Sequence, residues 1–343
     1  TWIGEQEENL AWDYLTRTRV ELDRYLTGSL KGTISDDQLE LACQSMLAAE
    51  GSDWFWWYGR DKDSGNDTAF DVSYRETLGQ VYDSLGLVRP DYLSVPIIQP
   101  TPVEPDKNLK GIFTPTLDGT VSDPTEWQNA GSFDLESTLT KLEFGFDPQN
   151  LYLNLSGTFT EDFTLYLNIP GTLLGNPFSD EKKVLGLYAT YRLRYLSTGS
   201  PVLAMEAWDG TSWQPLEGSE LVYALVTENL EISIPLSDLV PGLSAADDVL
   251  LRIVSGGNLL PLDAPARIIV PDLRETTWLF TVTDPTNDDR GPGSYTYPTD
   301  GVFKQGVFDL VTFNVGTDGE NVVSRVDMAG PVANPWGGAN DIS

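Results

Sequence analysis

The sequence predicts a multidomain protein of the α-then-β class, with a small three-helix bundle, a proline-rich linker, an antiparallel β-sandwich and part of a second β-sandwich. Three observations predict this class. Apolar residues recur at three- and four-residue spacing before residue 95, prolines then concentrate, and the apolar period changes to two beyond residue 106. A chain of 343 residues is long enough for two or three domains. We place the domains at 1–94, 107–272 and 273–343, with the linker at 95–106.

The first part of the chain predicts three amphipathic helices. Residues 5–27 carry an apolar stripe that ends at Gly28. Ser35 begins a capping box with Gln38 and leads into a helix that ends near Ala49. A third stripe begins near Asp67 and stops at Gly86. These three helices together form a small bundle.

Five consecutive aromatic residues lie in the predicted loop between the second and third helices. Consecutive helical residues point in different directions, so all five cannot reach one apolar face. One interpretation is a sugar site, because indole rings stack on the C–H face of a pyranose while carboxylates accept its hydroxyl groups. The other is a tryptophan-rich plug, and the residues alone do not separate the two. The candidate substrate-binding residues are Asp53, Trp54, Trp56, Trp57 and Tyr58.

Adjacent side chains diverge, so the tryptophans of this run should not share one role. We expect Trp54 and Trp57 to face sugar and Trp56 to pack inward. Asp53 either caps local backbone amides or accepts a sugar hydroxyl.

The run from Val95 to Pro105 is rich in proline, which forbids helix and favours an extended, semi-rigid spacer. Short alternating runs follow, and Asp209-Gly210 marks a hairpin turn between Trp208 and Trp213. Many short strands at regular spacing are typical of an antiparallel sandwich.

An acidic, glycine-rich segment near the C-terminal end is the best metal candidate. Hard carboxylate oxygens suit Ca²⁺, although a solvated Asp/Gly turn explains the same residues. The predicted ligands are Asp284, Asp288, Asp289 and Asp300. No organic cofactor is expected.

The composition excludes several classes of function. The net charge of −31 repels nucleic acid and anionic headgroups, whereas neutral polysaccharide is compatible with it. The absence of histidine removes imidazole catalysis, and a single cysteine excludes a disulfide framework. No apolar run reaches the roughly 20 residues of a membrane span. Without an initiator Met or a signal peptide, the sequence is expected to be a piece of a longer product.

The run Ala49 to Gly59, with Thr1 to Glu5 before it and Phe70-Asp71 after it, resembles the last signature region of glycoside hydrolase family 57. That family includes amylopullulanases, α-amylases and glucanotransferases. The resemblance covers about residues 1–95. It implies a helical region whose loop forms part of a glucan-binding cleft. It places the catalytic Glu and Asp upstream, so no catalytic residue is assigned here. A His that often follows the glycine in that family is replaced by Arg60.

Two further resemblances concern the β region. Four short motifs resemble sugar-binding sandwiches of the carbohydrate-binding-module family 9 kind, namely Leu117 to Gly119, Glu126-Trp127, Phe144 to Asp147 and Leu151 to Leu153. Thr283 to Asp300, with Gly306 to Leu310, resembles the start of the C-terminal domain of glucodextranase-like proteins. That resemblance supports the calcium prediction and implies a cell-surface location.

These observations predict part of an extracellular or cell-surface α-glucan-degrading glycoside hydrolase, with sugar-binding or spacer sandwiches. The implied partner is starch, glycogen or pullulan, and the implied chemistry is retaining, with a covalent glycosyl-enzyme. The alternative is a non-catalytic cell-surface structural or glucan-binding protein of the same architecture. Surface association or self-assembly is compatible with either.

Overall fold

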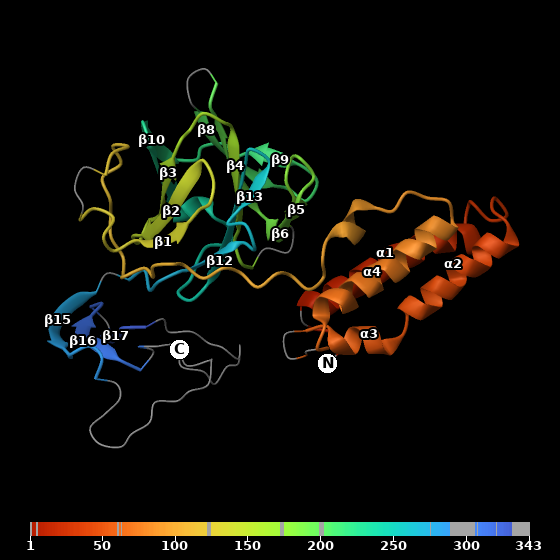
Figure 1. Ribbon diagram of the computed structural model, residues 1–343, viewed down its shortest axis with the longest axis horizontal. Helices are drawn as coiled ribbons and strands as arrows, with labels where there is room; N and C mark the ends of the chain where they lie inside the picture. Colours follow the sequence, from red (N-terminus) through yellow and green to blue (C-terminus); the bar gives the residue numbers. More distant parts are fainter. Residues whose placement is uncertain are drawn as a thin grey trace.

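The computed structural model describes residues 2–4, 6–59, 62, 64–121, 125–171, 175–198, 202–274, 276–288, 306, 308–319 and 321–330. A group of helices is followed along the chain by a two-sheet β-sandwich and then by a separate three-stranded sheet (Figure 1). The expected α-then-β organisation is therefore confirmed. Among the described helices, no stretch combines the length and the apolarity that a membrane span requires.

The three predicted helices form close to their expected bounds, and Ser35 and Gln38 make both hydrogen bonds of the predicted capping box. The aromatic run, which we expected to be a loop, is itself a short helix. The helical elements are α1 Gln6–Leu26, α2 Asp36–Ala49, α3 Ser52–Trp57, α4 Asp67–Ser84 and the 3-10 helix η1 Asp91–Ser94.

The apolar stripes of these helices meet in one core, which also takes in part of the aromatic run. Tyr74 of α4 is fully buried and donates a hydrogen bond from its hydroxyl to the carbonyl oxygen of Ala11 in α1, at 3.0 Å. This hydrogen bond compensates for burying the Tyr74 hydroxyl, because a buried hydroxyl without a partner would lower the stability of the fold.

The proline-rich segment is extended, and it contacts folded structure at both ends. Ile97 is fully buried in the helical core. Val103 pairs with Ala266 in a parallel bridge and accepts a 2.9 Å hydrogen bond from the backbone N–H of Arg267. The segment therefore connects the helices directly to the sandwich.

The sandwich consists of two antiparallel sheets. The five-stranded sheet has the order β1-β2-β3-β11-β10, with bounds Gly131–Asp134, Leu139–Phe146, Asn150–Gly157, Asn229–Pro235 and Val222–Val226. The seven-stranded sheet has the order β13-β12-β4-β7-β8-β9 with β14 beside β12, and the bounds Asn258–Leu260, Asp248–Ser255, Phe163–Asn168, Tyr191–Leu196, Val202–Trp208, Trp213–Pro215 and Ala266–Ile269. A small hairpin of β5 Asn176–Phe178 and β6 Val184–Ala189 lies beside this sheet, and η2 Leu236–Asp238 follows β11.

Alternation along the strands explains why the two sheets face each other. Leu151, Leu153 and Leu155 of β3 are fully buried in the sandwich core. Leu165 and Leu167 of β4 join the same core from the other sheet. Successive strand residues point to opposite faces, so a period of two leaves one face of each sheet for the core.

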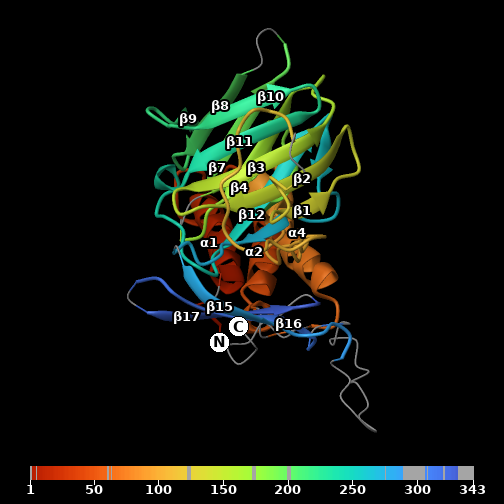
Figure 2. The ribbon, with the colours of Figure 1, turned by 90° about the vertical axis from the view of Figure 1, so that its left-hand side faces the viewer.

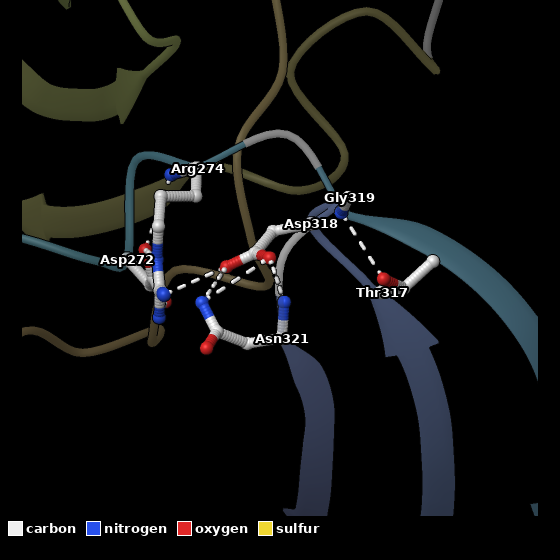
Figure 3. Close-up of polar contacts among 6 residues, drawn as sticks. All are labelled: Asp272, Arg274, Thr317, Asp318, Gly319 and Asn321. Atoms are coloured by element: carbon white, nitrogen blue, oxygen red, sulfur yellow. Dashed lines mark hydrogen bonds and ion pairs between the residues drawn. The ribbon is translucent and has the colours of Figure 1, made fainter.

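The third sheet consists of β15 Thr277–Thr283, β16 Leu310–Thr317 and β17 Val322–Met328. Figure 2 shows it below the strands of the sandwich. The segment that precedes β15 is bound to the β16–β17 turn through Arg274. This side chain donates to Asp318 in the turn at 2.7 Å and also pairs with Asp272 (Figure 3). Asn321 closes the turn with a 2.7 Å backbone hydrogen bond to the same Asp318 carboxylate.

Candidate functional site

The short helix α3 follows α2 after a break of two residues, Glu50 and Gly51. The indole Nε1–H of Trp54 donates a 2.8 Å hydrogen bond back to the carbonyl oxygen of Ala48 near the end of α2. Its ring also packs against Phe70 and Tyr74 of α4, with centroids 5.1 and 5.3 Å away. Trp54 therefore anchors α3 to the two neighbouring helices.

Two other members of the aromatic run are in the core. Phe55 is fully buried and stacks on Trp12 of α1 with ring centroids 3.9 Å apart. Tyr58 is also fully buried, and its hydroxyl donates to Asp71 at 3.2 Å. Burial raises the pKa of Tyr58 above its usual range, and the neighbouring negative charge of Asp71 adds to this effect. Both rings hold the end of α3 in a fixed position.

The carboxylate of Asp71 is the centre of the polar network beneath the run. Its Oδ2 atom accepts a 2.9 Å hydrogen bond from Arg75, one turn further along α4. Its Oδ1 atom accepts from Tyr58 and from the backbone N–H of Ile97, at 3.2 and 3.1 Å. The buried carboxylate of Asp71 thus links the aromatic run, α4 and the start of the proline-rich segment.

The remaining tryptophans lie on the surface. Trp56 and Trp57 are 39% and 38% exposed. Trp2, which is 50% exposed, packs against Trp56 with ring centroids 5.1 Å apart. The ammonium group of Lys62 lies 4.8 Å from the centroid of the Trp56 ring. We call Trp2, Trp56 and Trp57 the aromatic patch.

The structure therefore divides the predicted substrate-binding residues into two groups. Trp57 is on the surface, and its predicted contact with sugar stays a prediction. The expectation that Trp56 packs inward is wrong, and Trp54 has the anchoring role instead. The physical reason is the short helix and its end: α3 directs Phe55 to the core and leaves Trp56 and Trp57 on the other side. Tyr58 follows the helix with extended backbone and enters the core from there.

Asp53 is exposed in the first turn of α3, and Gly51 is the N-cap with no side-chain cap hydrogen bond. Within the part of the chain that the structure describes, Asp53 makes no side-chain hydrogen bond that would explain it as a cap. Sequence reasoning did not select Trp2 as a site residue. No local pattern marks it, since its place beside Trp56 depends on how α1 packs.

The predicted calcium ligands can be placed only in part. Asp289 and Asp300 lie outside the described residues. Asp284 and Asp288 flank Asn287, which adopts a positive φ of 68°. Among the residues that the structure describes, no group of three or more His, Cys, Asp or Glu side chains is arranged to hold a metal.

A buried carboxylate that the sequence did not single out contacts this turn. Asp309 is 2% exposed, and its Oδ2 atom accepts a 2.6 Å hydrogen bond from the backbone N–H of Asn287. Its Oδ1 atom is buried without a hydrogen-bond partner in the described structure.

Parts of this chain are similar to known proteins. Residues 279–343 match the family described as the C-terminal binding-module, SLH-like, of glucodextranase. One solved structure in the comparison is a carbohydrate binding module family 9 protein from Caldicellulosiruptor kristjanssonii in complex with cellotriose. It is 13% identical, with a TM-score of 0.29, over 48% of this chain and 81% of that one. None of the curated proteins compared with the chain matches it. The family match supports a binding module at the C-terminal end of the chain.

Proposed function

We propose that this chain is the accessory, glycan-binding part of an extracellular α-glucan-degrading glycoside hydrolase, and that the aromatic patch contacts the glucan. The observation that carries the proposal is the division of one aromatic run into a buried and an exposed half. Phe55 and Tyr58 fix the run in the core, while Trp56 and Trp57 keep more than a third of their surface exposed. Indoles held rigidly at a surface are suited to stack on pyranose rings.

The alternative is a tryptophan-rich plug where a helix end meets another domain, which would cover the indoles of Trp56 and Trp57. The binding test below separates the two, because a plug leaves the affinity of Trp57→Ala for maltoheptaose unchanged. The resemblance of the Ala49–Gly59 run to family 57 supports starch, glycogen or pullulan as the glucan, and the family's retaining chemistry as the reaction of the whole enzyme.

A second candidate is a non-catalytic surface protein that binds glucan. It is favoured by the match of residues 279–343 to an SLH-like binding module, which supports attachment at the cell surface. Sequence preceding Thr1 separates the two. A Glu and an Asp in the contexts of family 57 favour the hydrolase, and their absence favours the binder.

The test uses the full-length protein with Trp57→Ala and Trp54→Ala as a matched pair. Trp57→Ala is expected to weaken maltoheptaose binding at least tenfold and leave the melting temperature nearly unchanged. Trp54→Ala removes an anchoring ring and is expected to lower the melting temperature. If both variants lower stability and neither changes affinity when folded, the patch is structural and the proposal is wrong.

We also propose that Ca²⁺ binds at the turn that contains Asp284 and Asp288. The support is the buried Asp309 carboxylate, which has one oxygen bound to the turn and the other without a partner in the described structure. A buried carboxylate oxygen is costly to leave unpaired, and hard oxygen ligands are those that Ca²⁺ prefers.

A further inference from the structure

The β5–β6 hairpin covers part of the outer face of the seven-stranded sheet, on the side of the sandwich that faces the helices (Figure 1). Its second strand, β6, alternates between buried and half-buried residues. The buried ones form a small core with residues of the sheet, made of Leu185, Leu187, Ala189, Tyr166 and Val254. The amide of Asn168 in β4 also donates a 2.7 Å hydrogen bond to the carbonyl oxygen of Tyr188. Because successive strand residues point to opposite faces, Gly186 and Tyr188 point away from the sheet.

The proline-rich segment passes close to β6 at Gly186. This glycine has a positive φ of 74°, and a Cβ atom at its position would lie 2.9 Å from Cγ of Pro100 and 3.3 Å from Cδ of Pro265. A larger residue would collide with both proline rings, so glycine permits this close approach. The carbonyl oxygen of Pro265 also accepts a 2.8 Å hydrogen bond from the backbone N–H of Val103. The segment therefore packs on the hairpin instead of crossing free solvent.

Little of this segment lies free between its two attachments. The backbone N–H of Ile97 donates to a carboxylate of α4, and Val103 pairs with β14 of the sandwich. Residues 98–102 separate them and include Pro100 and Pro102, whose rings fix φ. A hinge between two domains needs backbone that can absorb a change in φ and ψ, and this stretch offers little.

Tyr188 extends from the hairpin to the helices. Its hydroxyl oxygen is buried, and burial raises the pKa of the phenol. The Tyr14 hydroxyl and the Arg17 guanidinium, both on α1, act on this pKa in the opposite direction, which places them near Tyr188. Tyr14 is itself 2% exposed and donates a 3.3 Å hydrogen bond to the carbonyl oxygen of Val95. The Tyr188 side chain is thus buried where α1 meets the start of the proline-rich segment.

We propose that the helices and the sandwich form one rigid unit, in which the β5–β6 hairpin joins them and Tyr188 makes the principal contact. Domains within one chain move relative to each other unless their interface restrains them. Here one restraint is Tyr188 against α1, and a second is Pro100 against Gly186. A third is weak, because the side chains of Lys182 and Asp91 are largely exposed at a separation of 3.6 Å. Contacts at three places oppose rotation about any one of them.

A flexible tether is the alternative, and a proline-rich spacer without contacts would favour it. Such a tether would leave the hydroxyl of Tyr188 in water, whereas it is buried here. In a rigid unit the aromatic patch keeps a fixed orientation to both sheets of the sandwich. This arrangement does not depend on the glucan binding proposed above.

Double electron–electron resonance between two spin labels tests the rigid unit in the chain of residues 1–343. The labels are attached to Gln44→Cys on α2 and Thr140→Cys on β2, both at exposed positions, after Cys43→Ser removes the native thiol. A rigid unit gives one narrow distribution of distances. Tyr188→Ala should at least double its width, because the principal contact is lost. Tyr223→Ala is the matched control, since it removes the same half-buried side chain from β10 in the five-stranded sheet and should leave the width unchanged.

The labelled protein with Tyr188 intact keeps the proposal testable if Tyr188→Ala does not fold. A broad or divided distribution in that protein would show independent domains and overturn the proposal. An unchanged width in folded Tyr188→Ala, or equal widening in Tyr223→Ala, would overturn the role of Tyr188 at the interface. No glucan is present, so the result is separate from the test of the aromatic patch.

Discussion

The indole Nε1–H of Trp127 donates a 3.1 Å hydrogen bond to Oε1 of Glu231, which lies 104 residues further along the chain. The other oxygen of this carboxylate accepts the backbone N–H groups of Asp118 and Gly119, at 3.0 and 2.8 Å. Glu231 is fully buried on β11, and burial raises its pKa. One carboxylate thus holds the segment before β1 against the outer face of the five-stranded sheet.

Replacing Glu231 by Gln should lower the free energy of unfolding by about 1–3 kcal/mol, since an amide offers one acceptor oxygen and leaves at least one buried N–H unpaired. The measurement is denaturant unfolding at neutral pH. Glu217→Gln, at an exposed position, is the control and should change stability by less than about 0.5 kcal/mol. Equal stability of the two variants would contradict the anchoring role.

Acid sensitivity of the sandwich should depend on Asp147, which is 6% exposed. Burial acts to raise its pKa, but hydrogen bonds from the Tyr152 hydroxyl and from the backbone N–H groups of Gln149 and Asn150 outweigh burial and lower it. A depressed pKa contributes stability above the unfolded-state value of 3.8 and loses it as the pH falls through the folded value.

The comparison is therefore between wild type and Asp147→Asn in unfolding experiments from pH 6 down to pH 2. The wild type should be the more stable at pH 6, and the difference should shrink below pH 3.8. A difference that stays constant over this range would show that the carboxylate does not titrate as its contacts imply.

Substitutions at neighbouring positions of the aromatic run should lower stability by very different amounts. Phe55→Ala removes a fully buried ring stacked on Trp12 and should cost about 3–5 kcal/mol of stability. Trp56→Ala should cost less than about 1 kcal/mol, since its ring is on the surface. Thermal unfolding of both variants measures the contrast, and similar costs would mean that the exposed half is packed in solution.

Calcium should stabilise the C-terminal sheet. At 100 times its dissociation constant, Ca²⁺ is expected to add about 2.7 kcal/mol. Asp309→Asn should weaken this effect, whereas Asp238→Asn, at a carboxylate in the sandwich, should not. The measurement is thermal unfolding with Ca²⁺ or with chelator in the full-length protein. If the C-terminal region is folded and its melting temperature is the same with Ca²⁺ and with chelator, the proposed site is refuted.

Residues 1–343 alone should release no reducing sugar from starch or pullulan, because the family 57 resemblance assigns both catalytic carboxylates to an upstream region. The measurement is a reducing-end assay on the purified chain. Glu50→Gln and Asp53→Asn identify any unexpected source of activity. Hydrolysis that disappears with either substitution would place catalysis here and reject the assignment.

The sequence by itself determined the order and type of the main elements, but not the short helix α3. The apolar period of the first 94 residues specified the helices, Ser35 and Gln38 specified the start of α2, and alternation specified the strands of the sandwich. These signals are local, because hydrophobic period and capping are properties of neighbouring residues. The aromatic run was recognisable as unusual for the same reason.

Only the tertiary structure decided which aromatic residues are buried and which are exposed. Trp54, Trp56 and Trp57 are alike in sequence, but the direction of α3 and the places of Ala48 and Trp2 assign them different roles. The Asp71 carboxylate likewise joins α4, the aromatic run and the start of the proline-rich segment. Such contacts form between residues far apart in the chain, so no local pattern records them.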